Sequence, residues 1–417
     1  MIVELGRIIR ENKRALTLAA GLTVGGLSGG MAAAQSPSPE SSPQPGETVL
    51  LPSPEGSLEP APKTPALRVP LAYWDQHTAF ESFKEHVDAF QSKGSHVELF
   101  SYYLGDDGNI KHYGPADEDE EIINFAHDTT DHKYVPVLAL ISNLPEDGDW
   151  DTKRVIKIIS DPERRAVHIQ DLLALTQEIG VDGINIDYEA LPPNQRENFT
   201  VFIQELSEVM HANDKKVGVS LHIKYGDDDP DNSQGAGAQD FAALGMYADY
   251  LGVMSFERHS DGTNPGPVRS CDTYEALAEY AISKIPAKNI FMGNPIYGFD
   301  WVAGTTEAEE LEHGEVKRIL DERGITPEFV PEDCGSTFEY TVNSAPKKRR
   351  NHVVWYEDAA TVGARLEISN ELGTNAMLWR VGNEALEDDI RDKSGRLLPG
   401  GEDPAIWDLF VAPASSE

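Results

Sequence analysis

The segment Asp182–Glu189 reads DGINIDYE, and its pattern decides the fold expected for this chain. Successive side chains of a β-strand point to opposite faces, so Asn185, Asp187 and Glu189 share one face. The two isoleucines and Tyr188 share the other face. In a barrel of parallel strands the apolar face meets the surrounding helices, and catalytic residues lie at the carboxyl ends of the strands. Inward polar groups are costly to bury unless they bind one another or a ligand, so the segment predicts a barrel strand that ends in a functional site.

Short apolar, β-branched or aromatic runs alternate with amphipathic helical stretches along the chain. The eight predicted strands are Arg68–Trp74, His96–Tyr103, Tyr134–Ser142, Val181–Glu189, Lys216–Ile223, Tyr250–Phe256, Asn289–Ile296 and Thr374–Arg380. This alternation predicts an α/β fold, a (β/α)8 TIM barrel. The alternative is a doubly wound open sheet, but the Gly-rich phosphate turn that usually opens such a sheet does not follow the first strand. The stretch of about 303–350 is too long for one helix, and we expect a small insertion between strands 7 and 8.

Composition divides the chain into three parts. Residues 1–34 carry four basic residues, an uncharged stretch (Ala15–Gly30) and three alanines at positions 32–34, which is the pattern of a cleaved signal peptide. The alternative is an uncleaved membrane anchor, although this stretch is poor in the large apolar residues that favour a membrane span. We expect residues 35–66 to be a Pro/Ser-rich disordered linker and residues 67–413 to be the barrel domain.

The charge of the chain restricts its partners. Its 417 residues include 71 acidic and 35 basic ones, for a formal net charge of −36. A surface this negative repels nucleic acid and anionic lipid, so we expect no nucleic-acid partner and no membrane span after signal cleavage. The sequence has no HExxH pair and no Cys/His cluster, so we expect neither a metal nor another cofactor. Cys271 and Cys334 are either a disulfide or two unpaired thiols, and the sequence leaves both possibilities open.

The carboxylates of Asp187 and Glu189 carry the predicted chemistry. Side chains at i and i+2 of a strand lie about 7 Å apart. Their mutual repulsion and burial are expected to raise one pKa, which leaves a protonated acid beside a carboxylate. Such a pair is suited to breaking a glycosidic bond. The alternative is a solvated acidic strand end without catalytic function.

The segment DGINIDYE resembles the DGxDxDxE signature of glycoside hydrolase family 18, the chitinase-like hydrolases. Val253–Glu257 resembles the MxYD segment of the family's sixth strand, and Gly293–Trp301 resembles its YGxxW segment. Trp379 sits where the family places the tryptophan floor of the sugar pocket. The similarity covers roughly residues 67–410. His352–Glu357 and Glu402–Trp407 look like the bacterial branch that includes spore-cortex and other cell-wall hydrolases.

The resemblance implies a retaining, substrate-assisted hydrolysis of β-linked N-acetylhexosamine polymers, such as peptidoglycan, chitin-like chains or exopolysaccharide. Glu189 would act as acid and base, and Asp187 would orient the acetamido group of the substrate and stabilise the developing charge. Substrate contacts are implied for Asn185, Phe256, Glu257, Trp379, Tyr297, Tyr73 and Met254. Together with the export signal, the resemblance predicts a secreted, periplasmic or cell-wall-associated glycosidase.

Two positions depart from the family pattern. Asn185 stands where many members have an aspartate, so the usual carboxylate relay beneath Asp187 is missing. Phe256 stands where the family commonly has a tyrosine, so the hydroxyl that would hold the acetamido carbonyl is missing. These departures keep a rival hypothesis open, a catalytically weak or inactive chitinase-like carbohydrate-binding protein. The retention of Glu189 favours the enzyme.

Three other side chains near predicted strand ends have structural alternatives. We interpret His222, at the end of the fifth strand, as a structural histidine rather than a substrate contact. Tyr297 and Trp301 follow the seventh strand, and they either line the substrate cleft or pack at the rim.

Overall fold

The structure, a computed structural model, describes residues 64–72, 76–105, 108–114, 116–146, 148–227, 235–343, 349–381 and 405–411. The predicted signal peptide and all but the last three residues of the predicted linker lie outside these ranges, as does Tyr73. None of the described helices is long and apolar enough to cross a membrane.

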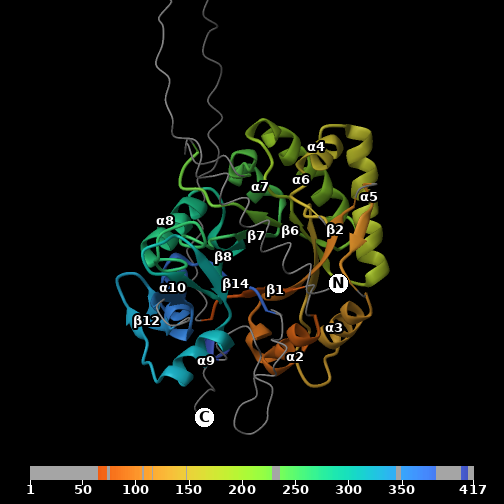
Figure 1. The fold of residues 1–417 in the computed structure, drawn as a ribbon. Helices are drawn as coiled ribbons and strands as arrows, with labels where there is room; N and C mark the ends of the chain where they lie inside the picture. Colours follow the sequence, from red (N-terminus) through yellow and green to blue (C-terminus); the bar gives the residue numbers. More distant parts are fainter. Residues whose placement is uncertain are drawn as a thin grey trace, which may run out of the picture.

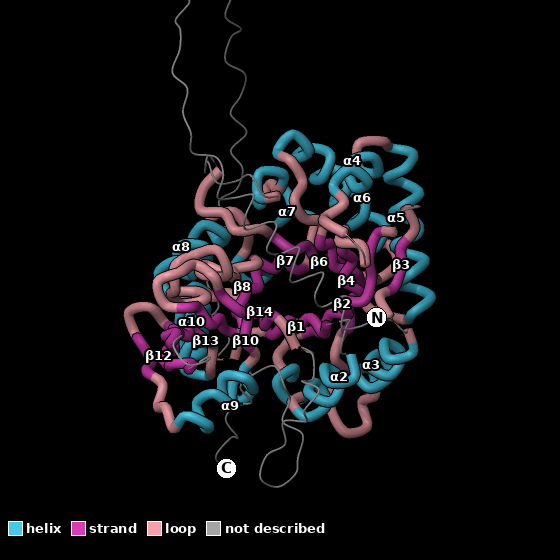
Figure 2. The backbone as a smooth tube through the Cα atoms, viewed as in Figure 1, coloured by secondary structure: helices cyan, strands magenta, loops and turns pink. Residues whose placement is uncertain are grey.

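Eight parallel strands close into a ring, which confirms the predicted (β/α)8 barrel. They are β1 (Leu67–Ala72), β2 (His96–Leu104), β4 (Val137–Ser142), β5 (Gly183–Asp187), β6 (Lys216–Leu221), β7 (Tyr250–Val253), β8 (Ile290–Pro295) and β14 (Asn375–Trp379). The first strand pairs with both β2 and β14, and this double pairing closes the ring. A short strand, β3 (Ile110–His112), adds antiparallel to β2. The ring of strands and the helices around it are visible in Figure 2.

Helices fill most of the connections between the strands and surround the ring (Figure 1). They are α2 (Gln76–Glu85), α3 (Asp117–His127), α4 (Thr152–Ile159), α5 (Pro162–Ile179), α6 (Arg196–His211), α7 (Phe241–Tyr247), α8 (Cys271–Ile282) and α10 (Ala359–Leu372). The ends of α5 show why a helix forms there. Asp161 accepts hydrogen bonds from the first free backbone N–H groups, and Gly180 ends the helix in the left-handed conformation, with φ of 81°.

The alternation predicted for the deciding strand is present in β5. Ile184 and Ile186 belong to the large apolar core between ring and helices. Tyr188, on the same face, stacks on Phe202 of α6 at 5.9 Å between ring centroids. Its hydroxyl lies 2.6 Å from His168 Nε2 of α5. Asn185 and Asp187, on the opposite face, are buried inside the ring.

The insertion between the seventh and eighth barrel strands is a second, antiparallel sheet. Its elements are β9 (Gly298–Val302), β10 (Ala308–Leu311), α9 (His313–Arg323), β11 (Glu328–Val330), β12 (Gly335–Asn343) and β13 (Arg349–Tyr356), with strand order β10-β9-β13-β12-β11. It is wider at both ends than the predicted range of 303–350. The reason is that Gly298–Val302 and Arg349–Tyr356, which are far apart in the sequence, pair with each other.

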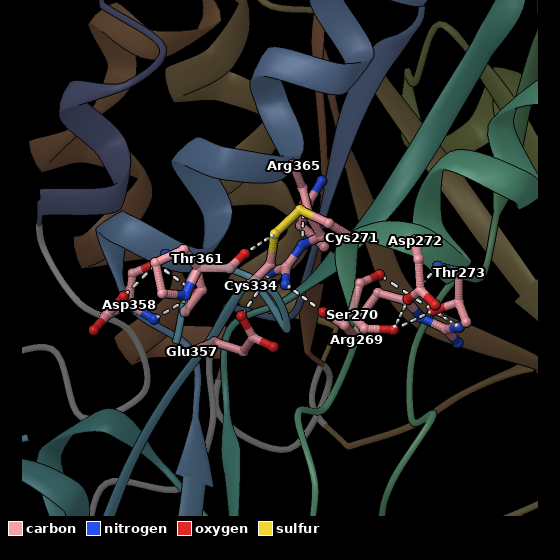
Figure 3. The surroundings of a disulfide bond; sticks show 12 residues. Arg269, Ser270, Cys271, Asp272, Thr273, Cys334, Glu357, Asp358, Thr361 and Arg365 are labelled. Carbon is pink, nitrogen blue, oxygen red and sulfur yellow. Dashed lines mark hydrogen bonds and ion pairs between the residues drawn. A yellow bond between two sulfur atoms is a disulfide. The ribbon is translucent and has the colours of Figure 1, made fainter. Parts of the chain in front are cut away.

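A disulfide and a buried ion pair join the insertion to the barrel (Figure 3). Cys334, in the turn before β12, is bonded to Cys271, the first residue of α8, with their Cα atoms 5.4 Å apart. Nearby, Arg365 Nη2 of α10 lies 2.6 Å from Glu357 Oε2, and neither side chain is exposed by more than 1%. The Arg365 guanidinium also donates to Asn294 and to the backbone oxygen of Arg269.

A short helix, α11 (Ala405–Asp408), covers the seam between the first and last units of the barrel. Trp407 is buried and stacks on His86 at 5.1 Å, just beyond α2. It also contacts Phe90 in the following 3-10 turn at 6.0 Å. The same helix also packs on α10. The seam is therefore closed by residues that follow the last strand.

Candidate active site

The predicted acidic pair lies at the carboxyl end of β5, where the strand leaves the barrel. Asp187 is the last residue of the strand and is 5% exposed. Glu189 follows two residues later, and its side chain is 22% exposed. One carboxylate is thus buried in the barrel, and the other reaches the surface at its mouth.

Asn143, at the end of the neighbouring strand β4, fixes the backbone of Glu189. Its amide oxygen accepts a hydrogen bond from the Glu189 N–H at 2.8 Å, and its amide nitrogen donates to the Glu189 carbonyl at 3.1 Å. Both polar groups of one side chain therefore hold the chain beyond β5 in place. Sequence analysis did not single out Asn143, although an asparagine directly after a buried strand is a signal that it could have used.

His222, interpreted from the sequence as a structural histidine, lies beside Glu189. Its Nε2 atom is 3.8 Å from Glu189 Oε2. This nitrogen is buried and has no hydrogen-bond partner among the described residues. Burial lowers the pKa of His222 to about 4, so the imidazole is neutral near pH 7. The structure therefore places a neutral ring within reach of the more exposed carboxylate.

A polar network fills the barrel beneath Asp187. Ser220 Oγ of β6 accepts hydrogen bonds from Asn185 Nδ2 at 2.9 Å and from Arg68 Nη2 at 3.1 Å. The same Arg68 nitrogen lies 2.6 Å from Glu98 Oε2. His96 Nε2 in turn lies 3.3 Å from Glu98 Oε1. Each of these side chains is at least 95% buried.

Asp187 has a raised pKa, whereas the hypothesis from the sequence assigned the neutral acid to Glu189 and the ionised carboxylate to Asp187. Burial raises the pKa of Asp187 to about 6, and the negative charge of Glu98 adds to the rise. The positive charge of Arg68 and a hydrogen bond with Ser220 act in the opposite direction. Sequence analysis had attributed the effect to burial and to repulsion within the acidic pair. The network beneath Asp187 brings in charges from strands that it did not consider.

Aromatic residues from β2 and from the loop after β7 gather around Trp379 of β14. Its ring lies 5.9 Å from that of Phe256 and 5.5 Å from that of Phe100. Trp379 and Phe256 are both half-buried. Met254, also half-buried, packs beside Phe256 against the interior residues of β8 and β14. These residues form an apolar surface at the same end of the barrel as the acidic pair.

The residues predicted beyond strands 6 and 7 meet at the insertion. The Tyr297 hydroxyl donates to Glu257 Oε1 at 3.2 Å, and Tyr297 is 3% exposed. Glu257 is exposed and adopts a left-handed backbone conformation, with φ of 52°. Trp301 is fully buried, and its indole donates to the backbone oxygen of Thr263. Of the two interpretations left open for Trp301, the structure supports packing at the rim.

Comparison with curated proteins finds bacterial glycosylases and cortical fragment-lytic enzymes among the relatives. YvbX of Bacillus subtilis, described as an uncharacterized glycosylase, is 29% identical over 256 residues, which cover 61% of this chain and 73% of the relative. The cortical fragment-lytic enzyme of the same species is 25% identical over 260 residues, which cover 61% of this chain and 58% of that enzyme.

Solved structures share the fold. A chitinase from Chromobacterium violaceum matches with a TM-score of 0.68 at 24% identity, over 83% of this chain and 98% of that one. The spore cortex-lytic enzyme SleL of Bacillus cereus matches with a TM-score of 0.69 at 18% identity, over 83% of this chain and 74% of that one. The model of the glycosyl hydrolases family 18 matches residues 72–384. The chain therefore belongs to glycosyl hydrolase family 18, and it is a glycosidase.

Proposed function

We propose that this protein is an exported, retaining glycosidase that cleaves β-linked N-acetylhexosamine polymers, with Glu189 as acid and base. The observation that carries the proposal is the pairing of a surface carboxylate with a buried one at the end of β5. Glu189 is accessible and is held by Asn143, and Asp187 is buried beside it. A polymer lying across the barrel mouth can reach the first carboxylate and present a sugar substituent to the second.

In the proposed first step, Glu189 donates its proton to the glycosidic oxygen, and the bond to the anomeric carbon breaks. The acetamido carbonyl of the same sugar attacks that carbon and forms an oxazolinium ion. Asp187 accepts a hydrogen bond from the acetamido N–H and stabilises the positive charge. Its Oδ1 atom is buried and has no hydrogen-bond partner among the described residues, so it is suited to this contact.

In the second step, Glu189 takes a proton from water, which attacks the anomeric carbon and restores the acetamido group with retained configuration. His222 stays neutral at the working pH because of its burial, so it does not compete with Glu189 as a proton source. Trp379 and Phe256 provide an apolar surface on which the face of a sugar ring can stack.

Peptidoglycan is the substrate that the relatives favour. The cortical fragment-lytic enzyme and SleL are named for action on spore cortex, and both resemble this chain over most of its length. Export is supported by the composition of residues 1–34 and by the disulfide between Cys271 and Cys334. Disulfides persist outside the reducing cytosol. Chitin-like oligosaccharide and exopolysaccharide are the alternative polymers.

The second candidate function is a carbohydrate-binding protein with little or no turnover. The observation that favours it is Phe256, which packs against Trp379 and offers no hydroxyl to the acetamido carbonyl. Loss of one neutral hydrogen bond to a reacting group lowers a rate by about ten-fold to a thousand-fold. This departure slows the proposed reaction but leaves the acid in place.

The test is release of reducing ends from purified peptidoglycan and from N-acetylglucosamine oligomers. We expect activity in the parent, none in Glu189→Gln, and full activity in Glu197→Gln. Glu197 is an exposed carboxylate in the first turn of α6, so it is a matched control for the loss of one negative charge. Binding without product by the parent and by Glu189→Gln alike would support the carbohydrate-binding protein and refute the glycosidase mechanism.

A further inference from the structure

The barrel interior contains a fully buried pair of opposite charges. Arg68 of β1 and Glu98 of β2 are 1% and 0% exposed, and their closest atoms are 2.6 Å apart. Gly252 of β7 makes room for the pair, because a Cβ at this position would lie 1.5 Å from Arg68 Nη1. Removing two charges from water costs several kcal/mol per ion, so a buried ion pair is weak evidence for a stabilising role. Its place beneath the acidic pair suggests a different role.

Ser220 connects the buried pair to Asp187. Its hydroxyl accepts from Arg68 and from Asn185, so its own proton remains to be donated. Ser220 is hydrogen-bonded to Asp187, and this bond lowers the pKa of the Asp187 carboxyl. The arrangement is a chain that runs from Glu98 through Arg68 and Ser220 to Asp187. Asn185, which also hydrogen-bonds to Ser220, adds no charge to this chain of contacts.

We propose that Arg68 is a positioning residue of the active site, which keeps Asp187 ionised through its positive charge and through Ser220, while Glu98 fixes the guanidinium. This inference rests on the proposed function, in which Asp187 must carry a negative charge to stabilise the oxazolinium ion. Arg68 makes no contact with substrate in this role. It acts only through the protonation state and orientation of Asp187.

The charged and titratable groups around Asp187 determine the direction in which each substitution should shift the pKa of Asp187. They are Arg68 from β1, His96 and Glu98 from β2, and Tyr250 from β7, with Glu189 and His222 toward the barrel mouth. Tyr250 stays neutral because burial raises its pKa to about 12. Burial opposes ionisation of Glu98, but Arg68 and His96 hold the pKa of Glu98 below its ordinary value. Arg68 and Glu98 therefore act on the Asp187 carboxyl with opposite charges.

Arg68→Met and Glu98→Gln should therefore change the pH profile in opposite directions. Loss of the positive charge raises the pKa of Asp187. The acid limb, which is the low-pH side of the pH profile of kcat/KM, therefore moves to higher pH. Loss of the negative charge lowers that pKa, so the limb moves to lower pH. Both charges act on the Asp187 carboxyl, so we expect displacements of about one pH unit in opposite directions. Two variants that merely damaged the fold would not move the limb in opposite directions.

Two further variants serve as controls. Arg68→Lys retains the positive charge and should keep the limb of the parent. Arg165→Met removes an arginine from another ion pair, with Glu205, on the outer helices α5 and α6, and it should leave the limb unchanged. If Arg68→Met does not fold, Glu98→Gln and Arg68→Lys still test the sign of the effect.

A measurement without turnover separates this proposal from the proposed function. The carboxyl ¹³C resonance of Asp187, assigned by its loss in Asp187→Asn, reports the same titration in inactive or active protein. Opposite displacements in this titration support the role of Arg68 even if no substrate is cleaved. An unchanged titration in Arg68→Met and Glu98→Gln would overturn the inference, and activity that is abolished by Glu189→Gln would still uphold the proposed function.

Discussion

The disulfide between the barrel and the insertion allows us to predict by how much its loss lowers the free energy of unfolding. Cys271 and Cys334 are 63 residues apart in the sequence, and the chain-entropy model assigns a loop of that length about 4 kcal/mol of stabilisation. The loop contains α8, the barrel strand β8 and most of the elements of the insertion up to β12. We therefore expect Cys271→Ala combined with Cys334→Ala to lower the free energy of unfolding by about 4 kcal/mol.

Urea unfolding, followed by tryptophan fluorescence, tests this prediction. The oxidised parent should show the higher midpoint, and the parent treated with reductant should unfold near the midpoint of the double variant. Reductant should have no effect on the double variant, which is the control for its action elsewhere in the chain. A loss below about 1 kcal/mol in both the reduced parent and the double variant would refute the reasoning from loop entropy.

Three predictions concern catalysis. Asn143→Ala removes both hydrogen bonds to the Glu189 backbone, so kcat on wall fragments should fall by about a hundred-fold. The thermal midpoint should stay near that of the parent. An unchanged kcat would show that these two hydrogen bonds do not position the acid. Phe256→Tyr restores a hydroxyl donor and should raise turnover of N-acetylated oligomers by about ten-fold or more, whereas no gain, together with cleavage of deacetylated chains, would argue against an acetamido nucleophile. Because the pKa of Asp187 is raised to about 6, its ionised form is lost as pH falls through that value, and kcat/KM should decline with it; a rate that stays constant down to about pH 4.5 would contradict this assignment.

The barrel was predictable because its signals are local. Each strand is a short apolar run, and it is followed by a helical pattern or a loop whose bounds can be recognised in the sequence. The alternation in β5 was equally local, so the directions of Ile186 and Asp187 followed from the period of two. The insertion was predicted from its length, but its bounds depend on the pairing of β9 with β13, which the sequence does not display.

The environment of the acidic pair was much less predictable. Asn143 follows β4, His222 follows β6 and Arg68 lies in β1, and only closure of the ring brings them close to β5. The apolar neighbours Leu67 and Val69 place Arg68 on the inward face of β1, but they do not indicate which groups its charge meets there. A single sequence shows which side chains are polar, but the pKa of Asp187 depends on which of them meet across the ring. For the same reason, the pairing of the two cysteines remained open until the fold was known.

The position of α11 has a practical consequence for shortened or tagged versions of the protein. A polypeptide ended after Val381 would retain all eight barrel strands, yet Phe90 would lose its contact with Trp407 and α10 its contact with α11. Removing a buried aromatic side chain costs about 3 kcal/mol or more, so such a truncation is expected to be prone to aggregation and protease digestion. The smallest fragment suitable for expression therefore extends through Phe410, and an affinity tag is best fused beyond Val411.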